Sequence, residues 1–196
     1  SEQRAKEIYE DCRYFDHETV LYQAKDFLFF HADIQGNLLV RQRIRALQAL
    51  LTRPELTVIT TYDGCMDQLK PLERVREELL HIGTESVVEV KALSERLVRL
   101  GYERTGQVDA PGQFAVRGGI VDIYGLTEDN PWRIELWDDE VDSIRSFDAE
   151  SQRSIENISE IVIYPAAEPI PGKGERAVSF PDYFPVDKSV FFLDEP

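Results

Sequence analysis

Cysteine is scarce in this sequence, and the cysteines that are present form no pattern. The two residues, Cys12 and Cys65, have no metal-ligand spacing. Zinc modules and disulfide-stapled secreted folds need such spacings, so a reduced, cytoplasmic protein is the plain interpretation. No apolar run reaches the roughly 18 residues of a membrane-spanning helix, and no signal-peptide pattern occurs. We therefore expect no membrane partner.

Basic residues are also few. The 196-residue chain has 22 lysines and arginines against 37 aspartates and glutamates, which gives a formal net charge of -15. The summed field of such a chain repels polyanions, so non-specific nucleic-acid binding is disfavoured. Hydrophobic residues make up 42% and charged residues 30%, which is ordinary for a soluble globular protein of one or two domains.

The sequence lacks a phosphate-binding loop, because Gly-x-x-x-x-Gly-Lys-Ser/Thr occurs nowhere in it. Asp194-Glu195 follows an apolar run, as does the Mg²⁺-binding acidic pair of a P-loop ATPase, but without the loop we interpret it as a vestigial strand end. His31 and Asp33 could in principle ligate a metal, although hydrogen-bonded surface is the plainer interpretation. We predict no catalytic residue, no cofactor and no metal site, and hence no enzyme.

The most informative stretch is Gln113–Phe147. Short runs of β-branched and aromatic residues alternate there with clusters of Gly, Asn, Pro and Asp, which is typical of an antiparallel meander. A period of two places Trp132, Ile134 and Leu136 on one face. Arg133 and Glu135 then lie on the other face, which meets solvent or a partner.

A glycine pair interrupts the alternation of this sheet. Phe114 and Val116 alternate with Ala115 and Arg117, but after Gly118-Gly119 the apolar positions change phase. We predict a β-bulge at the glycine pair, since one extra residue restores a single apolar face. Arg117 would then point outward, near Arg133 and Glu135. From the residues alone, a partner-binding face and a cross-strand Arg-Glu ladder that serves only the sheet are equally good interpretations.

The first third of the chain predicts a parallel α/β layer. A helix over 37–51 lies between short strands at 20–22 and 56–60, and strand-helix-strand order favours parallel pairing. Its arginines, Arg41, Arg43 and Arg45, could touch phosphates, but we prefer a solvated helix face. Other helices are predicted over 1–12, 71–76 and 90–100, and strands over 79–82 and 190–193. Phe27, Phe29 and Phe30 are predicted to pack against the core.

The central motif carries a resemblance to a known family. Phe-Ala-Val-Arg-Gly-Gly-Ile-Val-Asp-Ile-Tyr, then Arg-Ile-Glu-Leu-Trp-Asp-Asp-Glu-Val-Asp from residue 133, and Ser-Gln-Arg-Ser-Ile from residue 151, are similar to the UvrB-homology module of the bacterial transcription-repair coupling factors, the Mfd family. Residues 24–37 and 60–66 resemble Mfd rather than UvrB. The resemblance covers nearly the whole chain.

The resemblance implies an α/β fold made of two domains. Residues 1–75 and 176–196 would form a partial, degenerate RecA/P-loop-like α/β domain. Residues 76–168 would form an inserted small α+β domain with an antiparallel sheet, and residues 169–175 a linker. In Mfd a largely helical segment separates the Pro-Ala-Ala-Glu-like motif from the strand near residue 190, so we suspect an engineered or natural deletion and expect a fragment of a larger fold.

The resemblance also implies a partner and its contact residues. In the UvrB/Mfd family the small domain binds UvrA, and the corresponding positions here are Arg104, Arg117, Arg133 and Glu135. UvrB has an arginine where Ala115 stands, so one contact of that type is absent.

The implied function is recruitment of UvrA, which links stalled RNA polymerase to nucleotide excision repair. Polymerase and DNA would bind through domains outside this chain, and the ATP-dependent translocase motor of the family would lie there too. Two alternatives remain. One is an autoinhibitory module that docks on the rest of its own chain, and the other is a UvrB-like, DNA-engaging helicase fragment.

Overall fold

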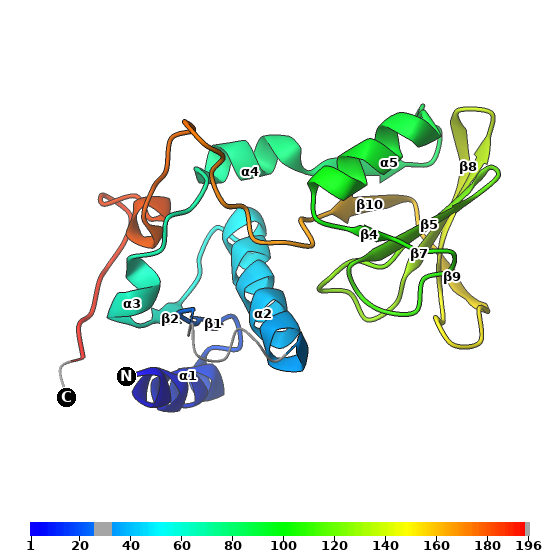
Figure 1. Ribbon diagram of the computed structural model, residues 1–196. Helices are drawn as coiled ribbons and strands as arrows, with labels where there is room; N and C mark the ends of the chain where they lie inside the picture. The colour runs from blue at the N-terminus through cyan, green and yellow to red at the C-terminus, as the bar shows by residue number, and fades with distance from the viewer. Residues whose placement is uncertain (26–32, 195–196) are drawn as a thin grey trace.

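The computed structural model describes residues 1–25 and 33–194, with the side chains of residues 33–37 left out (Figure 1). The predicted packing of Phe27, Phe29 and Phe30, the proposed His31 ligand and Glu195 therefore lie outside the described residues. Within them, no helix is both long and apolar enough to cross a membrane.

The chain begins with a small parallel α/β unit. Helix α1 (Glu2–Phe15) starts at Ser1, whose hydroxyl accepts a hydrogen bond from the backbone N–H of Arg4. Strand β1 (Val20–Tyr22) pairs in parallel with β2 (Val58–Thr60), and α2 (Asp33–Thr52) connects them. The predicted parallel layer is confirmed, because a parallel pair needs a crossover of this length.

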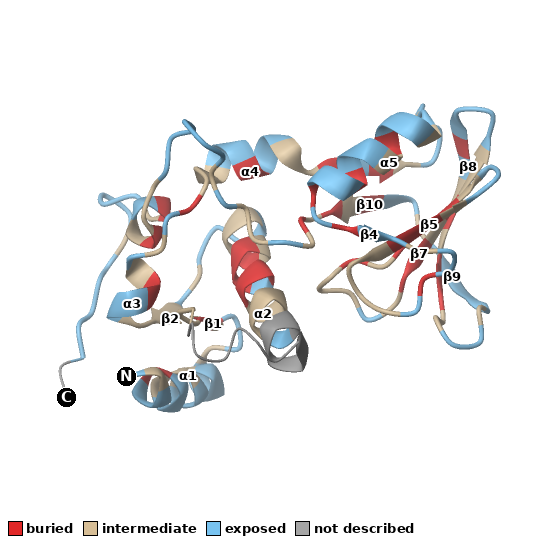
Figure 2. Cartoon of the chain, in the orientation of Figure 1, coloured by how far each residue is buried: buried red, intermediate tan, exposed pale blue. Residues whose placement is uncertain are grey.

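Buried residues of α2, coloured red in Figure 2, belong to the core of this unit. Ile44 and Leu47 pack with Tyr22 of β1 and with Phe180, whose ring stacks on Tyr22 at a centroid distance of 3.8 Å. Phe180 begins the short 3-10 helix η1 (Phe180–Tyr183), so the last part of the chain returns to the first. Two further helices complete this region: α3 (Tyr62–Cys65) and α4 (Leu72–Glu78).

The middle of the chain forms an antiparallel assembly. Its first sheet pairs β3 (Leu80–Gly83) with β10 (Glu160–Ile163). Its second has six strands in sequence order, with only β4 and β5 parallel. Their bounds are β4 (Glu103–Arg104), β5 (Gln113–Arg117), β6 (Ile120–Ile123), β7 (Trp132–Trp137), β8 (Glu140–Phe147) and β9 (Ser154–Asn157).

One face of the six-stranded sheet packs beneath α5 (Val90–Arg99). The strand register aligns Val121, Ile134 and Ile144 across three strands, and all three are buried. They form one cluster with Leu93 and Leu97 of the helix. The predicted meander and the apolar face of β7 are confirmed.

The predicted bulge at the glycine pair is wrong. Gly118 and Gly119 form the two-residue turn of the β5–β6 hairpin, with Arg117 paired to Ile120 and a φ of +60° at Gly118. A positive φ at only the first turn residue is the pattern of a type II′ turn, which matches strand twist. A register shift lies instead between β7 and β8, where Glu135 pairs with Ser143 and Leu136 with Val141, so β8 carries the extra residue, Asp142. A two-residue turn and a β-bulge both change the phase of the apolar alternation. The spacing of apolar residues therefore does not say where an extra residue lies.

The predicted strand over 190–193 is also wrong. Among the described residues they have no strand partner, and their apolar side chains are exposed. Asp194 forms an ion pair with Arg4 of α1, with 2.9 Å between Nε and Oδ2. That contact holds the segment beside a helix, where it gains no ladder hydrogen bonds.

Candidate interaction surface

The other face of the six-stranded sheet carries charged residues in two cross-strand rows. One row runs Ala115, Asp122, Arg133 and Arg145, and the neighbouring row runs Arg117, Ile120, Glu135 and Ser143. The structure therefore places three of the four predicted contact residues, Arg117, Arg133 and Glu135, on this outer face, as the period of two requires.

Asp122 is the centre of the outer face, although sequence reasoning did not single it out. Its carboxylate is fully buried, with 0% of the side chain exposed. Arg133 donates from Nε to Oδ1 at 2.7 Å and from Nη2 to Oδ2 at 2.9 Å, which is a bidentate pair. Arg117 donates to Oδ2 as well. A charged residue alternating with Val121 and Ile123 in a short strand was the available signal.

The Arg133 side chain makes several contacts with neighbouring residues of the same sheet region. Its guanidinium lies 4.2 Å from the ring centroid of Phe147, and Nη2 donates to Gln152 Oε1 at 2.9 Å. Only 13% of the side chain is exposed. The hydrogen bond from Arg133 to Asp122 raises the pKa of the guanidinium, so it stays charged. Arg133 thus contributes mainly to the internal order of this face.

Arg117 and Glu135 are more accessible. The Arg117 side chain is 43% exposed at the end of β5. Glu135 accepts hydrogen bonds from Arg145 and, at 3.0 Å, from Ser143 Oγ. The cross-strand Arg-Glu pair therefore exists, but it joins β7 to β8 through Arg145, which the sequence interpretation did not name.

Arg104 is not brought together with the other three. It lies in the two-residue edge strand β4, exposed, and its register partner is Phe114 of the buried row. Within residues 1–25 and 33–194 the structure records no ion pair for it.

A tryptophan at the end of β7 extends this face. Trp137 is 81% exposed, which is unusual for so large an apolar side chain. It lines a shallow, open pocket together with Gly119, Ile120 and Glu135. The pocket adjoins the β5–β6 turn that follows Arg117. An exposed aromatic side chain beside fixed charges is a common feature of protein-binding patches.

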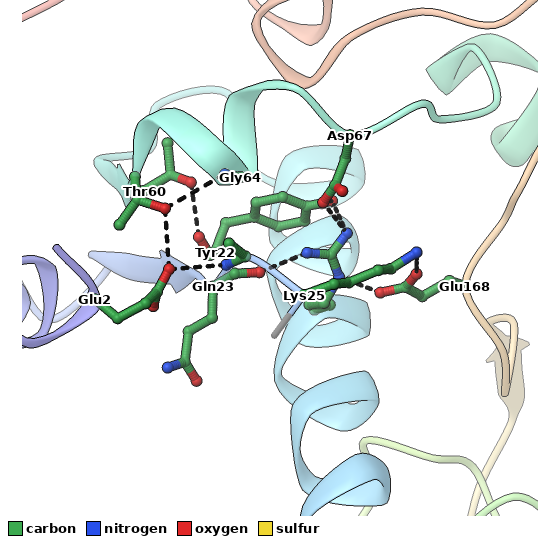
Figure 3. A network of polar contacts seen from close by, with 11 residues as sticks. Glu2, Tyr22, Gln23, Lys25, Thr60, Gly64, Asp67 and Glu168 are labelled. Carbon is green, nitrogen blue, oxygen red and sulfur yellow. Dashed lines mark hydrogen bonds and ion pairs between the residues drawn. The ribbon is translucent and has the colours of Figure 1, made fainter. Parts of the chain in front are cut away.

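A second arginine cluster lies inside the α/β unit (Figure 3). Arg43 of α2 was predicted to face solvent, but its side chain is only 2% exposed, so that prediction is wrong. It pairs with Asp67 at 2.6 Å and with Glu168, and its guanidinium lies 4.1 Å from the Tyr22 ring centroid. Lys25 also pairs with Glu168. Burial raises the pKa of the Tyr22 hydroxyl well above its ordinary value, so it stays protonated.

The chemistry available on these surfaces is recognition. Among the residues that the structure describes, no group of three or more His, Cys, Asp and Glu side chains could hold a metal ion. The outer face instead presents fixed guanidinium groups, a carboxylate and an exposed indole.

Comparison with known proteins gives consistent matches. Residues 80–168 match the family described as the UvrB interaction domain. The chain is 39% identical over 162 residues to a transcription-repair-coupling factor of Bacillus subtilis (strain 168), which covers 83% of this chain and 14% of that protein. It is 37% identical over 157 residues to the Staphylococcus haemolyticus (strain JCSC1435) factor, covering 80% and 13%. The chain thus spans about one seventh of the length of these relatives.

Proposed function

We propose, from the match of residues 80–168 to the UvrB interaction domain family, that this chain is the UvrA-recruiting part of a transcription-repair-coupling factor. In this role it links RNA polymerase stalled at a lesion to nucleotide excision repair. Polymerase and DNA contacts and the ATP-driven motor belong to parts of the whole protein outside this chain. The chain itself acts by binding, not by catalysis.

The observation that carries the proposal is the fixed position of charged groups on the outer face. Arg117, Arg133 and Glu135 project from paired strands and are held by ion pairs within the face. Binding then costs little side-chain entropy, because these rotamers are already ordered. Arg117, which is 43% exposed, is the group best placed to meet a carboxylate of UvrA.

The exposed ring of Trp137 supplies an apolar part of the same surface. Large aromatic side chains and arginines dominate binding energy at protein interfaces, and Trp137 is 81% exposed, so a partner could bury most of it. We place Arg104 at the margin of the surface, at the edge strand β4.

We also propose the domain division that the resemblance to the coupling factors implies. The sheet assembly corresponds to the UvrA-binding domain at 76–168, and residues 1–75 with 176–196 to a degenerate RecA-like domain joined by a linker at 169–175. The parallel β1–α2–β2 unit is compatible with such a domain. The sequence has no phosphate-binding loop. We therefore propose that the α/β domain supports the interaction domain.

Calorimetric titration of the chain with UvrA tests the proposal. Arg117→Ala and Arg133→Ala should weaken saturable binding by about 1–3 kcal/mol, the scale for losing a charged hydrogen-bond partner at an interface. Arg74→Ala is the matched control, because Arg74 is an exposed arginine of α4, outside the surface. Circular dichroism must show that each variant is folded.

Absence of binding by the folded wild-type chain would refute the proposal. Competition then separates the remaining possibilities. If the rest of the coupling factor binds the same surface, the face serves autoinhibition. Retention on duplex DNA at physiological salt would instead favour the UvrB-like alternative.

A further inference from the structure

We infer that Asp122 is a positioning residue for partner recognition: its buried carboxylate fixes Arg117 in the orientation that receives a carboxylate of UvrA. The inference rests on the proposed function and names the device by which that surface is specific. It also divides the arginines by role. Arg117 contacts the partner, and Arg133 holds Asp122.

Burial shows that Asp122 is not an ordinary surface acid. Its side chain is 0% exposed, whereas its partners Arg117 and Arg133 are 43% and 13% exposed. Each arginine reaches the same carboxylate, one from the neighbouring strand β5 and the other from the neighbouring strand β7. Exposure therefore rises from Asp122 outward to Arg117, and the buried acid anchors a group that meets solvent.

The fold itself does not require a carboxylate at this position. The adjacent member of the cross-strand row on β5 is Ala115, which is buried in a small apolar cluster with Val108 and Phe147. Buried ion pairs can often be replaced by apolar side chains of similar volume without loss of stability. A buried acid that holds an exposed arginine is better explained by the orientation it imposes than by the stability it gives.

Fixing Arg117 matters because arginine has several free torsions. An unheld side chain loses rotamer entropy when a partner orders it. The Arg117 side chain is already ordered by Asp122, because Arg117 Nη2 donates a hydrogen bond to Asp122 Oδ2. A guanidinium has five N–H donors, so donors remain for a bidentate contact with a carboxylate.

The charge of the three groups makes the inference testable against plain electrostatics. Arg117 and Arg133 with Asp122 sum to one positive charge, and Asp122→Asn raises this to two at nearly constant shape. If attraction to an acidic patch were the whole mechanism, Asp122→Asn would bind more tightly, most of all at low salt. Positioning predicts weaker binding at every salt concentration.

The experiment measures UvrA binding by calorimetry for wild type, Arg117→Ala, Asp122→Asn and the double variant, at low and physiological salt. We expect Asp122→Asn to weaken binding about tenfold. Arg117→Ala should cost less in the Asp122→Asn background than in wild type, because an unheld Arg117 has less to lose. Val121→Ala is the control, since it weakens the core from the next position of β6 and leaves the outer face intact.

A second variant covers the case in which Asp122→Asn fails to fold. Asp122→Val combined with Arg133→Met replaces the buried pair with apolar groups and keeps Arg117. Binding should fall toward that of Arg117→Ala. The inference is overturned if a folded Asp122→Asn variant binds as tightly as wild type or more tightly. It is also overturned if the Asp122→Val, Arg133→Met double variant keeps wild-type affinity. If wild type itself does not bind UvrA, the proposed function fails. If wild type binds, Arg117→Ala weakens it and the Asp122 variants do not, only this inference fails.

Discussion

Two arginine-carboxylate clusters in this molecule are built in opposite senses. On the outer sheet face the carboxylate is buried and an arginine emerges: Asp122 is fully enclosed and Arg117 is 43% exposed. In the α/β unit the arginine is buried, at 2% exposure, and the acids approach it from outside. The same pair of chemical groups therefore leaves the guanidinium of Arg117 partly exposed to solvent and encloses that of Arg43 within the chain.

The difference shows how burial assigns a role. Arg43 donates to Tyr22, Gln23 and Asp67 and pairs with Glu168, so its donors are used within the chain. It joins segments that lie far apart in the sequence and acts on folding. Arg117 pairs with Asp122 and its side chain is 43% exposed, so we propose that it acts on binding. Counting arginines in the sequence cannot separate these two cases.

The largest effect is expected for Arg43→Met. It leaves Asp67 and Glu168 without their buried partner, and breaking such a pair costs about 3–5 kcal/mol of unfolding free energy. Urea denaturation measures this. Arg53→Ala is the control, because Arg53 pairs with Glu18 at the surface and its loss should cost less than about 1 kcal/mol. Equal losses in the two variants would remove the distinction between buried and exposed arginines.

Arg117→Ala should show the reverse pattern. Asp122 keeps its bidentate partner Arg133, so the unfolding free energy should change by less than about 1 kcal/mol. UvrA binding should weaken by about 1–3 kcal/mol, or roughly fivefold to 150-fold. Paired denaturation and titration on the same preparations test this. A large loss of stability with intact binding would mean that both clusters are structural.

Gly119→Ala tests the turn that precedes the pocket, without altering any charge. A Cβ there would lie 2.8 Å from the carbonyl oxygen of Leu136, and the backbone N–H of Leu136 donates to Gly119 O at 2.8 Å. We expect a loss of about 1–3 kcal/mol, the range for local backbone strain, seen as a lower Tm in a thermal melt. Gly106→Ala is the control, because nothing lies within 4 Å of its added Cβ. Equal Tm values would show that the β-turn tolerates the contact.

The smallest effect concerns Glu128, a carboxylate that no arginine side chain neutralises by direct pairing in the described residues. Burial raises its pKa in the folded state above the unfolded value, so the folded chain binds more protons in that window. Stability therefore falls as pH rises from the unfolded pKa through the folded one. Glu128→Gln should be slightly more stable than wild type at pH 7, and the difference should vanish in acid. Denaturation at both pH values measures it, and a wild-type advantage at pH 7 would contradict it.

Periodicity predicted the parts of the fold that obey it. Alternation in β7 gave the two faces of the sheet, and the order of strand, helix and strand gave the parallel layer. It could not find the buried charges. Arg43 is spaced with Leu47 and Leu50 along α2, a hint of burial, but an arginine is interior only when distant acids meet it. Glu168 is 125 positions away in the chain, beyond any local pattern.

The candidate surface was predicted in type more than in detail. Alternation placed Arg133 and Glu135 outward, but their partners, Asp122 and Arg145, depend on strand register. Register here is set by a two-residue turn and by an extra residue in β8, Asp142, and neither can be located from alternation alone. Trp137 was missed because a strand-end tryptophan fits an apolar core equally well.

The strand pair β3–β10 has a consequence for moving the segment that it encloses into another protein. The segment enters the sheet assembly at Leu80 and leaves it at Ile163, and these two residues are register partners on adjacent strands. Because the two ends of this segment lie on adjacent, hydrogen-bonded strands, they are only one strand spacing apart. A host protein would therefore need only two chain ends at that separation to accept it. We therefore expect residues 80–163 to keep the arrangement of their outer face when they are moved into a surface loop of another protein.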